Sequence, residues 1–509
     1  MDWRLFATKS KGGYIRKPAV LNGLSEAHEI NGKGRTVTEL GGERKVSSVQ
    51  RAENHCDVGC PREDRVEPEG TGEARSTATR EHTEESGVES LFEKVLARDN
   101  LNSAFRRVVK NGGSAGVDGM KTTELLDYLK KEGEELLESL RNGKYKPKPV
   151  KRVEIPKPGG GVRLLGIPAV FDRMIQQALV QVIQPIFDPK FSDSSYGYRP
   201  GRKAQDAVGK SKQYYEEGYK VVVDIDLSKY FDTINHDLLM GYVRQEVQDR
   251  QVLELIKKYL KSGVMVNGVK EATEKGSPQG GPLSPLLSNI YLNEFDKEME
   301  VRGHRHIRYA DDIAVYVKSK RAGERVLESC RRYLEGKLKL KMNEEKSGTD
   351  SPLKAKFLGF ALYELRKVGI RVHEKALQKL KERLKELTRR NQGRRLSDVL
   401  EEVNRVLLGW MNYYALADMQ RHVETLSGWL RRRIRMYIWK QWKRVRTRYR
   451  NLQSRGIAKE QAWQWANTRK GYWRIAKSPI LSSALPDKYL ESLGLKNFSQ
   501  RYQVLHLSY

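Results

Sequence analysis

The chain has 509 residues, with 95 Lys or Arg and 65 Asp or Glu, which gives a formal net charge of +30. A chain of this length exceeds what one hydrophobic core usually organises, so we expect several domains. The positive charge indicates a polyanionic partner such as nucleic acid. No apolar run of about 18 residues is available to span a bilayer, so we expect a cytoplasmic protein without a membrane partner.

Residues 1–88 have an unusual composition. No Phe, Tyr or Trp occurs between Ile15 and Leu91, while Gly, Glu, Arg, Ser and Thr are frequent. Such a segment cannot bury enough apolar surface to offset the entropy of ordering. Cys56 and Cys60 lie here, but no second pair completes a tetrahedral zinc site. The sequence therefore predicts a disordered N-terminal extension.

The elements that follow change in kind along the chain. Helical spacing of apolar residues begins near Leu91 and returns in residues 125–140 and 171–186, with a short alternating strand at Val153–Ile155 between them. Strands and helices alternate in residues 221–317. After about residue 365 the apolar pattern is mainly helical. We expect an α+β or α/β domain with a central sheet, followed by a bundle that is mainly helical.

The segment KVVVDIDLSKYFD ends a predicted strand with carboxylates. By the alternation of a strand, Val221, Val223 and Ile225 face one side, and Val222, Asp224 and Asp226 face the other. Carboxylates at the end of a buried strand are costly unless a cation matches them. The pattern therefore indicates a cation site at this strand end.

The segment HIRYADDIAVYV predicts a tight hairpin whose turn carries Asp311 and Asp312. Alone, this pair is typical of a solvated polar turn. If the hairpin lies beside Asp226, three carboxylates converge, and hard divalent cations such as Mg²⁺ relieve their repulsion. Two such ions can activate a primer 3′-hydroxyl and stabilise a pyrophosphate leaving group. This arrangement predicts polymerase chemistry.

Several ordered blocks carry a family resemblance. YADD, DLSKYFD, GSPQGGPLSPLLSNIYLNEFD at residues 276–296 and YGYRPGRKAQDA at residues 196–207 occur with IPKPGGGVRLLGIPAVFDR and KFLGF. Together they resemble a reverse transcriptase of the group II intron type over about residues 91–365. The resemblance implies a right-hand polymerase fold, with fingers and palm around a central antiparallel sheet in residues 89–365.

The resemblance also implies roles for individual residues. Asp226, Asp311 and Asp312 would be catalytic and would bind two Mg²⁺ ions, or Mn²⁺ as a substitute, with the carbonyl of Leu227. Asp224 would be a neighbour of the site and no ligand. The residues implied to contact the incoming dNTP are Lys157, Arg163, Phe231, Gln279 and Lys346.

Each nucleotide contact has a structural alternative. Phe231 would exclude a 2′-hydroxyl, but could be a core residue. Lys157 and Arg163 would grip the triphosphate, or contact template phosphates as surface cations. The glycines beside Gln279 would let the backbone approach a base pair, or serve a turn. Lys346 would assist pyrophosphate departure, or be solvated.

The segment from Trp429 to Arg450 combines ten Lys or Arg with five aromatic residues and no acid. We expect its cations to lie along an RNA backbone, while its rings either stack on bases or pack in the bundle core. The predicted RNA-binding residues are Arg431, Arg432, Arg433, Arg435, Lys440, Lys443 and Arg444.

LLGWMNYYALA at residues 407–417, with this basic segment, is similar to the thumb or X domain of intron maturases. The resemblance implies an α-helical thumb and maturase domain in residues 366–450 and a nucleic-acid-binding segment in residues 451–509. It implies intron RNA, target DNA and dNTPs as partners in the bacterial cytoplasm or nucleoid. Paired Cys-x-x-Cys motifs of a homing endonuclease are missing, so we expect no endonuclease. Two alternatives stay open, namely a splicing-only maturase and a reverse transcriptase of the retron or diversity-generating type.

Overall fold

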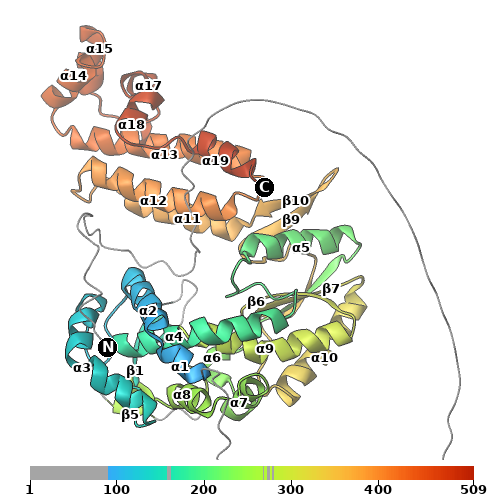
Figure 1. Cartoon of the computed structure of the whole chain (residues 1–509). Coiled ribbons are helices and arrows are strands. Elements are labelled where there is room, and N and C mark those ends of the chain that lie inside the picture. Colours follow the sequence, from blue (N-terminus) through green and yellow to red (C-terminus); the bar gives the residue numbers. More distant parts are fainter. Residues whose placement is uncertain (1–89, 157–161, 267–268, 272–274, 278–279) are drawn as a thin grey trace, which may run out of the picture. The chain divides into compact units, whose positions relative to one another are not determined.

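A computed structural model describes residues 90–156, 162–266, 269–271, 275–277 and 280–509 (Figure 1). The extension predicted for residues 1–88 lies outside the described residues, and so do Lys157 and Gln279. The described part of the chain falls within one compact unit.

Helices built on apolar stripes open the described chain. Helix α4 packs against α1 and α2. Its predicted apolar stripe is buried, apart from the half-buried Val182 and Ile186, because apolar residues recur at three- and four-residue spacing. The first helices are α1 Leu91–Leu96, α2 Arg98–Asn111, the 3-10 turn η2 Thr122–Glu124, α3 Leu125–Arg141, α4 Val170–Phe187 and the 3-10 turn η3 Asp188–Lys190.

A small mixed sheet has the strand order β2-β1-β4-β5, with β1 and β2 between α3 and α4 in the chain. Strand β1 pairs antiparallel with β2 and parallel with β4, and the register sets Ile155 opposite Arg163. Much of the β1–β2 hairpin is exposed. The strands are β1 Val150–Pro156, β2 Val162–Ile167, β4 Val264–Val266 and β5 Val269–Glu271.

The second sheet is antiparallel throughout and has the order β6-β7-β3-β8. Alternation divides its side chains between two clusters, because successive residues of a strand face opposite sides. Val223 and Ile225 join the large core, whereas Val222 joins a smaller cluster with Tyr214 of α5. The strands are β3 Val221–Ile225, β6 Arg305–Tyr309, β7 Asp312–Val317 and β8 Gly348–Asp350.

Helices cover both faces of this sheet, with α5 on one side and α9 and α10 on the other (Figure 1). The predicted α+β domain with a central antiparallel sheet is therefore confirmed. The helices of this part are α5 Ala204–Glu216, α6 Tyr230–Thr233, α7 His236–Arg244, α8 Arg250–Leu260, α9 Ser284–Val301 and α10 Lys320–Gly336.

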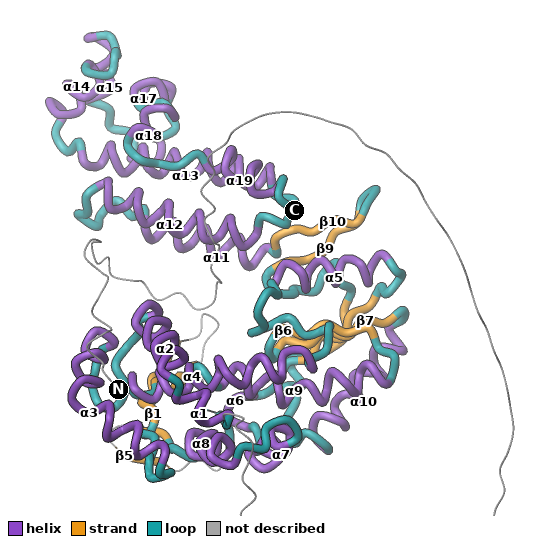
Figure 2. Tube along the Cα trace, in the orientation of Figure 1, coloured by secondary structure: helices purple, strands orange, loops and turns teal. Residues whose placement is uncertain are grey.

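After the hairpin of β9 Phe360–Glu364 and β10 Val368–Val372, the described chain is helical (Figure 2). The sequence predicts a helical region that begins at residue 366, and β10 corrects that boundary, because its alternating residues pair with β9. One apolar cluster joins this hairpin to the helices as far as Tyr502. Residues 451–509 thus share a core with the helices before them, because their apolar residues are buried there. The helices are α11 Glu374–Leu387, α12 Leu396–Tyr414, α13 Gln420–Gln441, α14 Val445–Gln453, α15 Lys459–Ala466, α16 Tyr472–Ile475, α17 Pro479–Ala484, α18 Asp487–Ser492 and α19 Phe498–His506.

Within the described ranges, no helix combines the length and apolar content needed to cross a bilayer.

Candidate active site

The carboxylates predicted to act together lie on adjacent strands. Strands β3 and β7 pair antiparallel with Ile225 opposite Ile313. Asp226 follows β3 directly, and Asp312 is the first residue of β7. The register therefore brings Asp226 and Asp312 side by side at one end of the sheet, which meets the condition that the sequence left open.

Asp311 lies in the two-residue turn between Tyr309 and Asp312, which are paired in the β6–β7 register. The first turn residue, Ala310, has a left-handed φ of 58°. A non-glycine residue is uncommon in this region, and strained positions of this kind often occur at functional sites. The turn presents Asp311 at the same sheet end as Asp226.

Burial, and then mutual repulsion, raise the pKa values of Asp312, Asp311 and Asp224. Desolvation, followed by repulsion from Asp311, Asp224 and Asp226, raises the pKa of Asp312 to about 6. Desolvation also raises the pKa of Asp311, with Arg163 opposing the rise. The pKa of Asp224 rises to about 6 through desolvation and the nearby Asp226, although its side chain still contacts solvent. The sheet end therefore concentrates negative charge that a cation would relieve.

The donor chemistry of this sheet end fits a hard divalent cation, because Asp226, Asp311 and Asp312 offer only oxygen. Leu227 lies opposite Met342 in an isolated bridge. That bridge uses the Ser228 amide, which donates to Lys341, and the Asp226 carbonyl, which accepts from Asn343, and so does not use the Leu227 carbonyl. Among the described residues, no three His, Cys, Asp or Glu side chains are gathered as a formed metal cluster.

Asp226 is held in place by three residues that lie further along the chain than β7. Ser347 Oγ accepts a hydrogen bond from the Asp226 amide at 3.0 Å. Asn343 Nδ2 donates to Asp226 Oδ2 at 3.3 Å, and Lys346 Nζ forms an ion pair with the same oxygen at 3.2 Å. The structure therefore brings the predicted Lys346 to the carboxylate cluster. Asn343 and Ser347 were not predicted.

A buried polar network holds the turn of Ala310 and Asp311, and the sequence did not predict this network. Arg308 is completely buried and donates to both carboxylate oxygens of Asp296, to Asn289 Oδ1 and to Ser195 Oγ. Its Nη1 also donates to the carbonyl of Ala310 at 3.1 Å. Arg308 therefore ties the strained turn to α9. The sequence held one signal, since Arg308 occupies a strand position next to YADD where a core residue would be apolar.

The other residues predicted to contact the incoming nucleotide differ in where the structure places them. Arg163 lies on the exposed β2 strand, close enough to lower the pKa of Asp311. Phe231 is only 7% exposed and belongs to the large core, which is the alternative that the sequence left open. Lys157 and Gln279 lie in parts of the chain that the structure does not describe.

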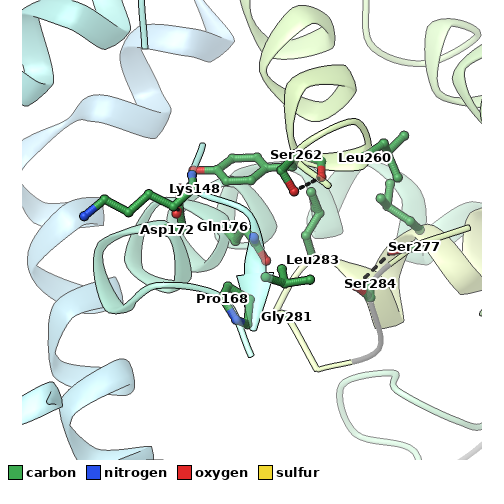
Figure 3. Close-up of a pocket in the computed structure, with 13 residues that line it drawn as sticks. Lys148, Pro168, Asp172, Gln176, Leu260, Ser262, Ser277, Gly281, Leu283 and Ser284 are labelled. Carbon is green, nitrogen blue, oxygen red and sulfur yellow. Dashed lines mark hydrogen bonds between the residues drawn. The ribbon is translucent and has the colours of Figure 1, made fainter. Parts of the chain in front are cut away.

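The glycines beside Gln279 meet protein atoms. A Cβ at Gly280 would overlap the Gly166 carbonyl of β2, and one at Gly281 would overlap Gln176 Oε1 of α4. Figure 3 shows Gln176 near this loop, with the Ser277–Ser284 hydrogen bond of 2.9 Å beside them. The cavity behind the loop holds only about 20 Å³, which is room for one water molecule. Packing of the loop on α4 and β2 therefore gives these glycines a structural reason.

Comparison with known proteins agrees with this geometry. Residues 155–362 match the family model for reverse transcriptase (RNA-dependent DNA polymerase). Residues 377–456 match the group II intron, maturase-specific domain. Protein YkfC of Escherichia coli (strain K12) is 35% identical over 300 residues, which cover 51% of this chain and 79% of that protein. The chain belongs to the group II intron type of reverse transcriptase.

Other relatives of this reverse transcriptase are intron proteins. The group II intron-encoded protein LtrA of Lactococcus lactis subsp. cremoris is 29% identical over 336 residues, or 53% of this chain and 56% of LtrA. The putative COX1/OXI3 intron 1 protein of Saccharomyces cerevisiae is 27% identical over 340 residues, or 54% of this chain and 40% of that protein. The chain thus spans about half the length of these two relatives.

A solved structure, the partial Cas6-RT-Cas1–Cas2 complex, aligns at 24% identity with a TM-score of 0.33. The alignment covers 48% of this reverse transcriptase and 43% of that chain. A likeness of this size supports no argument about function.

The maturase domain uses several of the predicted RNA-binding arginines internally. Arg433 is 9% exposed, and its guanidinium donates to Thr388 Oγ1 and to the Lys385 and Thr388 carbonyls at the end of α11. Arg433 therefore caps the end of α11, and we no longer count it among the surface cations that could contact RNA. The sequence could not show this, because α11 and α13 meet only in the tertiary structure.

The other predicted cations of the maturase domain differ in availability. Arg431 and Arg435 pair with Asp487 at 3.2 and 2.9 Å, and Arg432 lies over the Trp473 ring at 3.8 Å. Lys440 lies 5.1 Å from the ring centre of Tyr472. Lys443 and Arg444 are exposed.

The aromatic rings of this segment are mainly core. Tyr437, Trp439 and Trp442 are 2%, 2% and 8% exposed and belong to the cluster that joins the C-terminal helices. Of the two roles left open for them, packing in the bundle is therefore the one that the structure bears out.

Proposed function

We propose that this reverse transcriptase copies a group II intron RNA into cDNA at a two-metal centre held by Asp226, Asp311 and Asp312. The observation that carries the proposal is the register of β3 and β7, which brings Asp226 beside the turn of Asp311 and Asp312. Aligned carboxylates with raised pKa values suit a site that binds divalent cations. A protein that only bound RNA would have no physical need for them.

Under this proposal, Asp226, Asp311 and Asp312 would hold two Mg²⁺ ions with help from the Leu227 carbonyl, and Mn²⁺ could replace them. Bound there, the ions would activate the primer 3′-hydroxyl and neutralise the charge on pyrophosphate. Arg163 would grip the triphosphate with its planar fork, and Lys157 would share this role. Lys346, which already neighbours Asp226, would assist pyrophosphate departure. Phe231 and Gln279 would contact the sugar and the base pair.

The maturase domain would bind the same intron RNA and assist its splicing. Its relatives LtrA and the yeast intron 1 protein are named as intron proteins, and the domain match at residues 377–456 supports this role over that of a retron or diversity-generating enzyme. Exposed Lys443 and Arg444 are the cations best placed for phosphates. Target DNA and dNTPs would be the other partners, in the bacterial cytoplasm or nucleoid. We divide the chain into fingers and palm at residues 89–365, a thumb at residues 366–450 and a nucleic-acid-binding segment at residues 451–509.

Primer extension on an RNA template, with dNTPs and Mg²⁺, tests the proposal. The unaltered chain should extend the primer, whereas Asp311→Asn should abolish extension and keep near-normal affinity for intron RNA, because it removes a metal ligand and no phosphate contact. No extension by the unaltered chain, with RNA binding and splicing intact, would instead establish a splicing-only maturase. Ribozyme secondary structure in the flanking DNA separates the intron type from other lineages.

A further inference from the structure

The segment from Ser194 to Arg199 runs beside strand β6 and ends at the carboxylate turn. Ser195 and Arg308 form a parallel bridge, Arg308 donates its amide to Ser194, and Tyr196 donates its amide to Arg308. Continuing this register along β6 brings residue 197 beside Ala310, and so brings Tyr198 next to the turn that carries Asp311. The glycine confirms the first placement, because a Cβ on Gly197 would overlap the backbone of Tyr309 and Ala310.

Both neighbours of Tyr198 are fixed firmly. Asn289 Nδ2 donates to the Gly197 carbonyl at 2.8 Å. On the other side, Arg199 is 8% exposed, and its guanidinium donates to the Asp188 carboxylate at 3.0 Å and to the Ser192 carbonyl at 2.6 Å. The backbone that carries Tyr198 is therefore held from both sides.

Tyr198 itself is both strained and exposed. Its φ is 59°, in the left-handed region that bulky residues seldom adopt. Tyr198 is 47% exposed, whereas every other described tyrosine except Tyr509 is buried or half-buried. Strain of this kind persists only where the surroundings impose it, and it clusters at ligand-binding positions. The Tyr198 ring is thus exposed and is not needed for core packing, although its backbone conformation costs free energy.

Two charged side chains of the candidate active site lie near Tyr198. Desolvation raises the pKa of Tyr198, with Asp311 adding to the rise and Arg163 opposing it. The ring therefore lies within electrostatic reach of both. These are the carboxylate assigned to a metal and the arginine assigned to the triphosphate, so the inference rests on the proposed function.

We propose that Tyr198 packs its ring against a nucleoside at the reaction centre. Two nucleosides meet there, namely that of the incoming nucleotide and that at the primer terminus, and both offer an apolar base or sugar face. Aromatic rings bind such faces with little regard for sequence. Arg163 and the carboxylates address only phosphates and metal, so Tyr198 supplies an apolar contact that they lack.

The test compares Tyr198→Ala, Tyr198→Gly and Tyr198→Phe with Tyr509→Ala, which removes another exposed tyrosine. Glycine adopts a φ of 59° without strain, so Tyr198→Gly keeps the backbone and loses only the ring. We expect both Ala and Gly variants to weaken one nucleoside contact by about tenfold. Tyr198→Phe and Tyr509→Ala should stay close to the unaltered protein, and melting temperatures should change little.

Two measurements identify the nucleoside. A raised KM for dNTP with unchanged primer–template affinity assigns the ring to the incoming nucleotide, and the reverse assigns it to the primer terminus. If the Ala and Gly variants change neither quantity, the inference is wrong. Recovery of activity in Tyr198→Gly alone would also overturn it, because the backbone and not the ring would then matter. An inactive unaltered chain would count against the polymerase proposal instead.

Discussion

Arg308 Nη2 lies 2.6 Å from Asp296 Oδ2, and both side chains are completely buried. Burial raises the pKa of Asp296, but Arg308 and His306 outweigh it and leave that pKa below its ordinary value. The pair is therefore charged in the core, directly beneath the turn that carries Asp311.

We expect Arg308→Ala or Asp296→Ala to destabilise the fold by about 3–5 kcal/mol, because each leaves one uncompensated buried charge. Chemical denaturation followed by circular dichroism measures this loss. The double variant Arg308→Met/Asp296→Leu removes both charges and should recover most of the stability. We expect this double variant to polymerise more slowly than the unaltered chain, because the Ala310 carbonyl loses its hydrogen-bond donor. Single variants as stable as the unaltered chain would contradict the burial of the pair.

Phe231 combines a predicted contact with a core position. Truncation to alanine should relax the rejection of ribonucleotides and also cost about 3–5 kcal/mol of stability, because the ring is nearly buried. Phe231→Leu should cost less stability and still lower the ratio of kcat/KM for dNTP to that for rNTP. An unchanged ratio in folded Phe231→Leu and Phe231→Ala would assign the ring to packing alone.

Lys346 and Asp226 form an exposed ion pair, with the lysine side chain 65% exposed. Such pairs contribute roughly 0–1 kcal/mol, so Lys346→Ala should barely change the melting temperature. If the lysine assists the departure of pyrophosphate, single-turnover incorporation should slow while the KM for dNTP stays nearly constant. Lys346→Arg serves as the charge-preserving control. Normal incorporation by the alanine variant would favour the solvated alternative.

The basic segment from Trp429 to Arg450 holds a buried cation, Arg433, and exposed cations such as Lys443 and Arg444, whose removal should have different effects. Arg433→Ala should lower stability, because three hydrogen bonds at the end of α11 are lost. The folded fraction should bind RNA with little change. The double variant Lys443→Ala/Arg444→Ala should leave stability unchanged, weaken RNA binding and reduce its salt dependence. Filter binding at several salt concentrations, beside thermal melts, measures both. If Arg433→Ala weakened RNA binding as much as the double variant does, the assignment of Arg433 to the core and of Lys443 and Arg444 to RNA contact would be wrong.

Asp172 provides a stability change with pH. Burial raises its pKa to about 6, against hydrogen bonds from Tyr145 and the Lys148 amide and the charge of Lys148. The folded chain therefore keeps this proton up to about pH 6, whereas the unfolded chain releases it near its ordinary value of 3.8. Stability from this group is fully present below pH 3.8 and is lost as the pH rises through 6.

The loss amounts to about 3 kcal/mol. Asp172→Asn cannot ionise, so its stability relative to the unaltered chain should rise by about that amount between pH 4 and pH 7. Urea denaturation of both proteins across this range measures the difference, and the other titrating groups cancel in it. A constant difference would mean that Asp172 has an ordinary pKa in the folded chain.

The sequence by itself determined the local features of this protein. Alternation in residues 221–226 fixed which side chains face the core, and helical spacing fixed α3, α4 and the later helices, because these patterns depend on residues near one another. The ordered motifs also determined the family and named Asp226, Asp311 and Asp312.

Only the tertiary structure decided how distant segments meet. It placed Lys346 on Asp226, buried Arg433 against α11, and set Arg308 and Asp296 together beneath the turn. In the folded chain Tyr198 is exposed and Phe231 is buried, although both are aromatic residues within family motifs. A charged or aromatic side chain has the same identity in water and in a core, so its role depends on which partners the fold brings to it.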